Sequence, residues 1–295
     1  MNVEGIVERY RSGAISPPVT IMQLLIETED FASTRAAVRG VDELEQLVAA
    51  NAEGCERIAA MLRADVDSAK PAKSVAEGIA FCERLFDWSV QQSEEASVAL
   101  YSLGNPQLLE RATTEIVSQL KAWGAVTKDT ALLDIGCGIG RLLVALAPEI
   151  RSATGIDVSA EMVKAARRRC APYSNVTVIK GDGLGLGSLG NEAFDVAIAV
   201  DSFPYLRQSG YALAERFFAE SARVLKPGGQ LVILNYSYSE NEDADAQEVR
   251  ALSAENRLEV RVAGTRPFRL WDGVAFRMTK PGPQPPAGPP TAPGR

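Results

Sequence analysis

The sequence predicts an α/β protein with a doubly wound, mostly parallel seven-stranded sheet, preceded by a helical N-terminal region. Three observations lead to this prediction. Short apolar segments alternate with helical segments from about residue 105, the first hundred residues show helical patterns only, and ten residues link the last two strand-like segments, 258–263 and 274–279. Alternating strands and helices imply βαβ units in a sheet covered on both faces. A ten-residue link is too short for a helical crossover, so the last two strands are expected to form an antiparallel hairpin.

The N-terminal region, residues 1–104, is predicted to be helical. Ser16 and the two prolines after it form a start signal for a helix over 19–27. Apolar residues recur every three or four positions over 41–66, which is typical of an amphipathic helix. A capping-box spacing precedes a further helix over 75–90. We expect this region to act as a cap or lid, or as a homodimer interface.

The second part of the chain, residues 105–280, alternates strands with helices. Asn105 precedes a proline, which predicts a helix over 106–123. The segment 226–229, Lys-Pro-Gly-Gly, predicts a stop and turn directly before the fifth strand. The proline-rich tail, 281–295, is expected to be disordered. The other elements expected are strands at 131–135, 153–157, 176–180, 194–200 and 230–235, and helices at 142–147, 160–170, 211–225 and 244–256.

The composition excludes several classes of chemistry. The 295 residues include no histidine, which rules out a Ser-His-Asp triad, a Cys-His dyad, a His-ligated zinc site and an imidazole base. The net charge of −7 argues against a nucleic-acid partner, and the basic run 167–169 is expected to cap a helix. We find no signal peptide, membrane-length apolar run or metal-ligand spacing, and therefore expect a cytoplasmic protein without a metal or a membrane partner. Four cysteines are expected to be core residues in a reducing compartment, Cys55, Cys82, Cys137 and Cys170.

A glycine-rich turn follows the first predicted strand. The segment 132–141 is LLDIGCGIGR. Glycines allow a ligand to approach the backbone closely, and in a doubly wound sheet this turn borders the ligand crevice. The spacing is G-x-G-x-G, whereas dinucleotide-binding folds use G-x-G-x-x-G. Asp134 before the glycines suits an ammonium group better than a pyrophosphate, because like charges repel.

This turn resembles the D-x-G-x-G-x-G motif of class I S-adenosylmethionine-dependent methyltransferases. The resemblance covers about residues 100–280 and implies a seven-stranded sheet that ends in an antiparallel pair. Four further landmarks support it in the expected order: Gly155-Ile156-Asp157, Gly181-Asp182-Gly183, Phe194-Asp195-Val196 and the segment 223–229.

The resemblance implies S-adenosylmethionine as cofactor and S-adenosylhomocysteine as product. It implies that Asp134 orients the methionine ammonium and that Asp157 accepts hydrogen bonds from both ribose hydroxyls. The turn residues Gly136, Cys137 and Gly138 would lie beside the methionine moiety. Further contacts are implied for Val158 and Met162 on the adenine, Asp182 and Gly183 at its polar edge, Asp201 near the methyl group, and Tyr101 from the N-terminal region.

The acceptor is expected to enter over the carboxyl ends of the strands. Our candidates for orienting or deprotonating it are Tyr205, Tyr236 and Asp201. Each of these assignments has an alternative: aspartates at strand ends often cap helices, tyrosines often pack in a core, and most arginines are solvated. The candidate substrate-binding residues are Phe203, Tyr205, Tyr236, Arg266 and Trp271.

The sequence therefore predicts a methyltransferase that acts on a nitrogen or oxygen of a small molecule. Displacement at a sulfonium methyl needs little proton transfer, so proximity and exclusion of water can supply most of the catalysis without histidine. Two other classes stay open: an NAD(P)-binding oxidoreductase and a non-catalytic scaffold that retains the cofactor fold.

Overall fold

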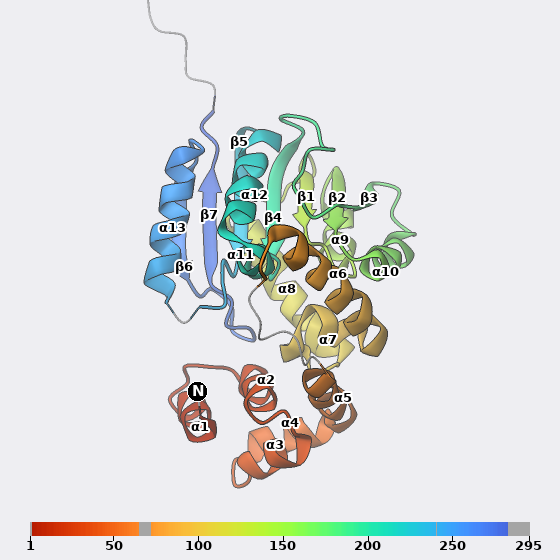
Figure 1. Ribbon diagram of the computed structural model, residues 1–295, viewed down its shortest axis with the longest axis vertical. Coiled ribbons are helices and arrows are strands. Elements are labelled where there is room, and N and C mark those ends of the chain that lie inside the picture. The colour runs from red at the N-terminus through yellow and green to blue at the C-terminus, as the bar shows by residue number, and fades with distance from the viewer. Residues whose placement is uncertain (1, 65–71, 240, 283–295) are drawn as a thin grey trace, which may run out of the picture.

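The computed structural model describes residues 2–64, 72–239 and 241–282 (Figure 1). Seven strands form one sheet in the order β3-β2-β1-β4-β5-β7-β6. The first five are parallel, and β7 pairs antiparallel with both β5 and β6, so the predicted sheet and its terminal hairpin are confirmed. The strands are β1 (Ala131–Ile135), β2 (Ser152–Asp157), β3 (Val176–Lys180), β4 (Phe194–Val200), β5 (Leu225–Leu234), β6 (Glu259–Thr265) and β7 (Ala275–Thr279).

Helices cover both faces of the sheet. They are α8 (Pro106–Ala122), α9 (Arg141–Leu146), η2 (Ala147–Glu149), α10 (Ala160–Cys170), α11 (Phe203–Ser209), α12 (Tyr211–Val224) and α13 (Glu242–Glu255). Successive residues of a strand point to opposite faces. Leu132 accordingly packs in one cluster with α8, α9 and α10, whereas its neighbour Leu133 packs in a second cluster with α12 and α13. Burial on both faces explains why these strands are continuous apolar runs.

The N-terminal part, within residues 2–64 and 72–104, is helical throughout and lies beyond one end of the sheet (Figure 1). The predicted helix over 41–66 is two helices, because the buried Asn51 ends the first one. The Asn51 Nδ2 donates to the Leu47 carbonyl (2.8 Å), and its Oδ1 accepts from Asn105 Nδ2 (2.6 Å). Residues 65 and 66 of that prediction lie outside the described residues. The helices are α1 (Val3–Arg11), α2 (Pro17–Thr28), α3 (Phe31–Ala37), α4 (Asp42–Ala50), α5 (Ala52–Ala64), α6 (Val75–Gln92), α7 (Glu94–Val98) and η1 (Leu100–Ser102).

The turn predicted at 226–229 is a bulge inside β5. Leu225 pairs with Phe194 and Gln230 pairs with Val196. Between these two pairs β5 advances by five positions and β4 by two. Gly228 takes the left-handed conformation that this bulge needs, with φ of +83°. The predicted tail lies outside the described residues from residue 283 onward. No helix in the described ranges is long and apolar enough to span a bilayer.

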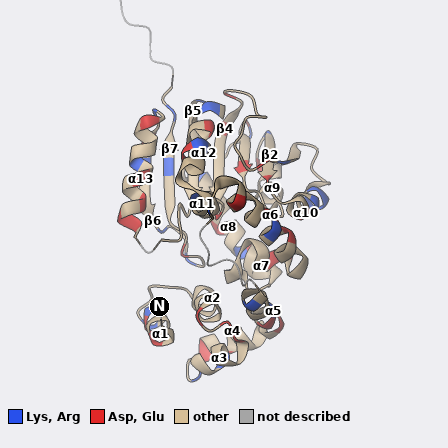
Figure 2. Cartoon of the chain, in the orientation of Figure 1, with Lys and Arg blue, Asp and Glu red and all other residues tan. Residues whose placement is uncertain are grey.

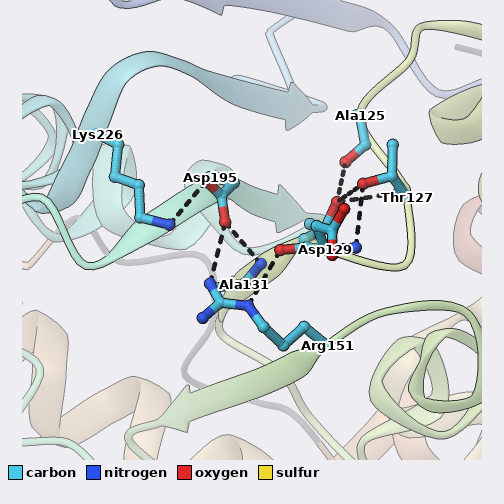
Figure 3. Close-up of polar contacts among 8 residues, drawn as sticks. Ala125, Thr127, Asp129, Ala131, Arg151, Asp195 and Lys226 are labelled. Atoms are coloured by element: carbon cyan, nitrogen blue, oxygen red, sulfur yellow. Dashed lines mark hydrogen bonds and ion pairs between the residues drawn. The ribbon is translucent and has the colours of Figure 1, made fainter.

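Asp195 ties three strands together at their amino ends (Figure 3). Its carboxylate accepts hydrogen bonds from the Ala131 amide (2.8 Å) and Lys226 Nζ (2.8 Å), and Arg151 approaches within 3.5 Å. Partial burial raises the pKa of Asp195, but the Lys226 and Ala131 hydrogen bonds outweigh it and the pKa is lowered overall. This landmark residue therefore holds the sheet together at the edge opposite the ligand crevice.

We expect Asp195→Ala to lower the free energy of unfolding by about 1 kcal/mol at pH 7, a figure reduced because the carboxylate is partly exposed. Because the folded pKa is below the unfolded one, the stabilisation is present above about pH 4 and is lost as the pH falls further. Urea unfolding at pH 7 and pH 3 tests this. The prediction is contradicted if the variant loses the same amount of stability at pH 7 and at pH 3.

Candidate functional site

A cavity of about 910 Å³ lies at the carboxyl ends of the parallel strands. The glycine turn after β1, the ends of β2 and β4, and the N-terminal helices all line it. This is the crevice where ligands bind in doubly wound sheets.

The glycine turn brings backbone to the cavity wall at Gly136 and Gly138. Both have positive φ, of +72° and +52°. A Cβ at Gly136 would lie 2.4 Å from the Ser202 Cβ, and one at Gly138 would lie 2.7 Å from Val98 Cγ1. Only glycine fits at either position without moving its neighbours.

Asp157 ends β2 with its carboxylate at the cavity. Its Oδ2 accepts from the Gly138 amide (2.8 Å) and its Oδ1 from the Ser159 amide (2.9 Å). Burial raises the pKa of Asp157, while these two amides lower it. An ionised carboxylate offers about four acceptor positions, so Asp157 can still accept from a ligand. Ser159 caps α10 by accepting from the Met162 amide, so Asp157 is not needed for that task.

Asp134 is a buried carboxyl at the end of β1, and within the described chain no hydrogen-bond donor reaches it. Burial raises its pKa to about 7, the Arg141 charge lowers it, and the Asp157 charge raises it. A buried carboxyl without a donor is costly to ionise, which makes this position a candidate for a ligand cation.

Asp201 follows β4 and lines the same cavity. Its Oδ1 accepts from Asn235 Nδ2 (2.7 Å), and the Tyr238 hydroxyl lies 3.4 Å away. Asp201 and Asn235 both have left-handed backbone conformations, with φ of +55° and +64°. Burial raises the pKa of Asp201 to about 6, while the Asn235 hydrogen bond and the Arg141 charge lower it. Strained backbone and a shifted pKa at a cavity wall are typical of functional sites.

Aromatic side chains line the cavity in two groups. Tyr205 packs edge-to-face on Phe86 (4.8 Å between ring centroids) and on Tyr238 (5.9 Å). Tyr101 stacks on Trp271 at 5.7 Å. These groups give the cavity an apolar surface that suits a flat or aliphatic acceptor.

The structure brings most of the predicted site residues together. Those that line the cavity are Tyr101, Gly136, Gly138, Asp157, Val158, Met162, Gly183, Asp201, Tyr205, Arg266 and Trp271.

Five predicted residues do not line the cavity. Tyr236 and Phe203 are fully buried in the core cluster with α12 and α13, stacked 5.6 Å apart, and the Tyr236 hydroxyl donates to Glu248. The prediction that these two residues contact the acceptor is therefore wrong, because both rings pack in the core and do not reach the crevice. Asp182 is exposed and accepts from the Leu184 amide within its own turn. Asp134 and Cys137 are buried behind the cavity wall.

The sequence predicted Tyr101 at the cavity but not the other residues of the N-terminal helices that line it. Ile79, Cys82 and Phe86 of α6 line it, together with Met22 and Ile26 of α2. The three α6 residues are spaced three and four apart, which marks one helix face. That spacing predicts that one face of the helix is buried, but it does not tell whether this face contacts the core or a cavity.

Opposite charges join the N-terminal helices to α10, as the acidic and basic residues of Figure 2 indicate. Glu94 of α7 pairs with Arg168 and Arg169, and Glu95 lies 3.4 Å from Arg169. Asp87 of α6 accepts from the Ser159 hydroxyl (2.6 Å). The basic run predicted only as a helix cap therefore also pairs with the N-terminal region.

Comparison with known proteins agrees with this geometry. Residues 133–233, about a third of the chain, match the family described as the methyltransferase domain. This part of the chain is therefore similar to methyltransferase domains. The predicted family, fold class and S-adenosylmethionine cofactor are confirmed at this level, and the NAD(P) alternative gains no support.

Two solved structures share the fold. A phosphoethanolamine N-methyltransferase of Haemonchus contortus matches with a TM-score of 0.56 and 16% identity, over 71% of this chain and 50% of that one. Magnesium protoporphyrin IX methyltransferase of Synechocystis, solved with bound S-adenosylmethionine, matches with a TM-score of 0.51 and 18% identity, over 69% and 97%.

Two curated relatives match part of the chain. Demethylmenaquinone methyltransferase of Tropheryma whipplei is 32% identical over 115 residues, which is 38% of this chain and 44% of that protein. An S-adenosyl-L-methionine-dependent Diels-Alderase of Talaromyces variabilis is 27% identical over 150 residues, half of each chain. The chain thus spans half or less of the length of these two relatives.

We expect the double variant Glu94→Gln, Glu95→Gln to release S-adenosylhomocysteine about fivefold faster than the unchanged protein, because partly exposed ion pairs are each worth under about 1 kcal/mol. Stopped-flow dissociation measures this rate. Glu161→Gln is the matched control, since Glu161 pairs with Lys164 inside α10 itself. Equal rates for the double variant and the control would contradict a closing role for these pairs.

The raised pKa values predict a pH-dependent stability. Because the folded pKa of Asp134 is above its unfolded value, the protein loses stability as the pH rises from about 4 to about 7. Asp134→Asn should remove this loss. At pH 8 we expect its free energy of unfolding to be at least about 1 kcal/mol higher than that of the unchanged protein, and at pH 4 we expect no such gain. Urea unfolding at both pH values tests this. An effect of the variant that is independent of pH would contradict it.

Proposed function

We propose that the protein transfers a methyl group from S-adenosylmethionine to a nitrogen or oxygen of a small, largely apolar acceptor. The observation that supports this most is a set of three carboxyl groups at the ends of β1, β2 and β4. Asp157 and Asp201 line the cavity, and Asp134 is buried behind its wall. A sulfonium cofactor with an ammonium group brings positive charge to such a site. A pyrophosphate would bring negative charge and be repelled.

The residues present fit this cofactor. The free acceptor positions of Asp157 suit two vicinal ribose hydroxyls, and the unpaired carboxyl of Asp134 suits the ammonium group. Val158 and Met162 offer apolar contacts for the adenine, beside the backbone of Gly183. When bound, the cofactor supplies an electrophilic methyl group on a positively charged sulfur.

The N-terminal helices α1 and α2 are proposed to form the acceptor half of the cavity. Ile6, Met22 and Ile26 contribute apolar surface there, opposite the cofactor half at β1 and β2. Ser16 Oγ donates to the Leu270 carbonyl (2.6 Å), which ties α2 to the loop that carries Arg266 and Trp271. Enclosure by this cap would hold the acceptor at attack distance and keep water out.

Asp201 is the proposed proton acceptor. A carboxyl with a pKa of about 6 is mostly ionised at neutral pH and can take a proton from a bound hydroxyl or amine. Asn235 orients the carboxylate by its hydrogen bond, and Tyr238 stands beside it. Tyr205 is proposed to position the acceptor through its ring, which forms the wall between Phe86 and Tyr238.

A second candidate function is a cofactor-dependent cyclisation without methyl transfer. The similarity to the Diels-Alderase favours it, since that match covers half of the chain. An apolar cavity could fold a polyene acceptor as readily as it holds a methyl acceptor. The two functions differ in their products, because only methyl transfer forms S-adenosylhomocysteine.

The test of the cofactor is calorimetric titration with S-adenosylhomocysteine and with NAD. We expect S-adenosylhomocysteine to bind, and Asp157→Ala to weaken it at least about a hundredfold, because two ribose hydrogen bonds to a charge are lost together. Asp195→Ala, at the opposite edge of the sheet, is the control and should bind normally. Binding of NAD alone would overturn the proposal. Turnover is then tested by S-adenosylhomocysteine release with apolar phenol and amine acceptors, and product formation without that release would favour the cyclisation.

A further inference from the structure

Arg141 is a buried cation with neutral partners. It begins α9 directly after the glycine turn and is 9% exposed. Its Nη1 donates to Thr113 Oγ1 (3.2 Å) and its Nη2 to the Tyr101 hydroxyl (3.4 Å). Among the residues that the structure describes, no carboxylate forms an ion pair with it. An arginine stays charged, so the positive charge of a buried arginine without a paired anion remains unbalanced.

The Tyr101 hydroxyl can donate a hydrogen bond to a ligand. A guanidinium has no acceptor, so the tyrosine oxygen must accept from Arg141. No hydrogen bond within the described chain uses the hydroxyl hydrogen, and Tyr101 lines the cavity. Burial raises the pKa of Tyr101 to about 12, so the hydroxyl keeps its proton at neutral pH. The ring itself is fixed by stacking on Trp271.

This pair faces an otherwise acidic crevice. The charge of Arg141 acts on both Asp134 and Asp201 and lowers the pKa of each. A ligand anion would be repelled by those two carboxylates except where a cation and a donor compensate them. Tyr101 provides the donor at the cavity wall, and Arg141 provides the cation behind it.

We propose that Tyr101 and Arg141 receive the carboxylate at the amino-acid end of the cofactor. The Tyr101 hydroxyl donates to the carboxylate, and Arg141 is a positioning residue that holds and polarises this hydroxyl. Asp134, buried behind the cavity wall, balances the neighbouring ammonium group, so the two charges of one zwitterion have separate partners. This inference rests on the proposed use of S-adenosylmethionine.

The experiment compares two ligands by calorimetry: S-adenosylhomocysteine and its decarboxylated analogue, which keeps the amino group. We expect the unchanged protein to prefer the carboxylated ligand by about tenfold or more, as a hydrogen bond to a charge provides. Tyr101→Phe keeps the ring and its stacking and should bring the preference close to one. Arg141→Met should do the same, and Arg141→Lys should restore part of it.

The ratio of the two affinities separates recognition from a structural role, because loosening the cap would weaken both ligands alike. Arg167→Met is the matched control, since Arg167 donates to the Val178 carbonyl away from the cavity and its loss should leave the ratio unchanged. If Arg141→Met fails to fold, Tyr101→Phe still decides the result. An unchanged ratio in Tyr101→Phe, or no preference in the unchanged protein, would overturn the inference and leave the proposed function intact. Failure of the unchanged protein to bind either ligand would instead overturn the proposed function.

Discussion

Buried negative charge at one edge of the sheet is the constraint on which the rest of the site depends. Parallel strands all end at the same edge, so aspartates at the ends of β1, β2 and β4 come together there, Asp157 and Asp201 at the cavity and Asp134 behind its wall. Carboxyl groups taken out of water resist ionisation unless cations or donors reach them. The chain answers with two backbone amides at Asp157, an asparagine at Asp201 and one buried guanidinium shared between Asp134 and Asp201. These groups compensate the negative charge only in part, and this is why a cationic cofactor fits the site.

The two edges of the sheet divide stability from function. At the amino edge, Asp195 is paired with Lys226 and the Ala131 amide, and its pKa is lowered. At the carboxyl edge, Asp134 and Asp201 are under-compensated, and their pKa values are raised. The same residue type thus stabilises the fold at one end and costs stability at the other. Function concentrates where the cost is, because a ligand can relieve it.

The sequence predicted the sheet well, but it did not predict which way two aromatic side chains turn or where the helix over 41–66 breaks, for a physical reason. Strands buried on both faces must be apolar runs, and the glycine turn can exist only with residues that lack a Cβ, so both leave local signals. Tyr236 and Phe203 gave no such signal. An aromatic residue after a strand can turn into the core or into the crevice, and tertiary packing against Phe218 and Phe276 decides for the core. The break at Asn51 likewise depends on Asn105, 54 positions away.

The missing histidine acquires a structural meaning in this light. Burial raises the pKa of Asp201 to about 6, so the proposed proton acceptor of this site needs no imidazole. The same burial would make a histidine costly, since an imidazolium beside Asp134 or Asp201 would form an ion pair and occupy the charge that the cofactor needs. An arginine held behind Tyr101 avoids this, because its guanidinium compensates the acids from a distance and leaves them open to the ligand. The acidic crevice is therefore compatible with a chain that has no histidine.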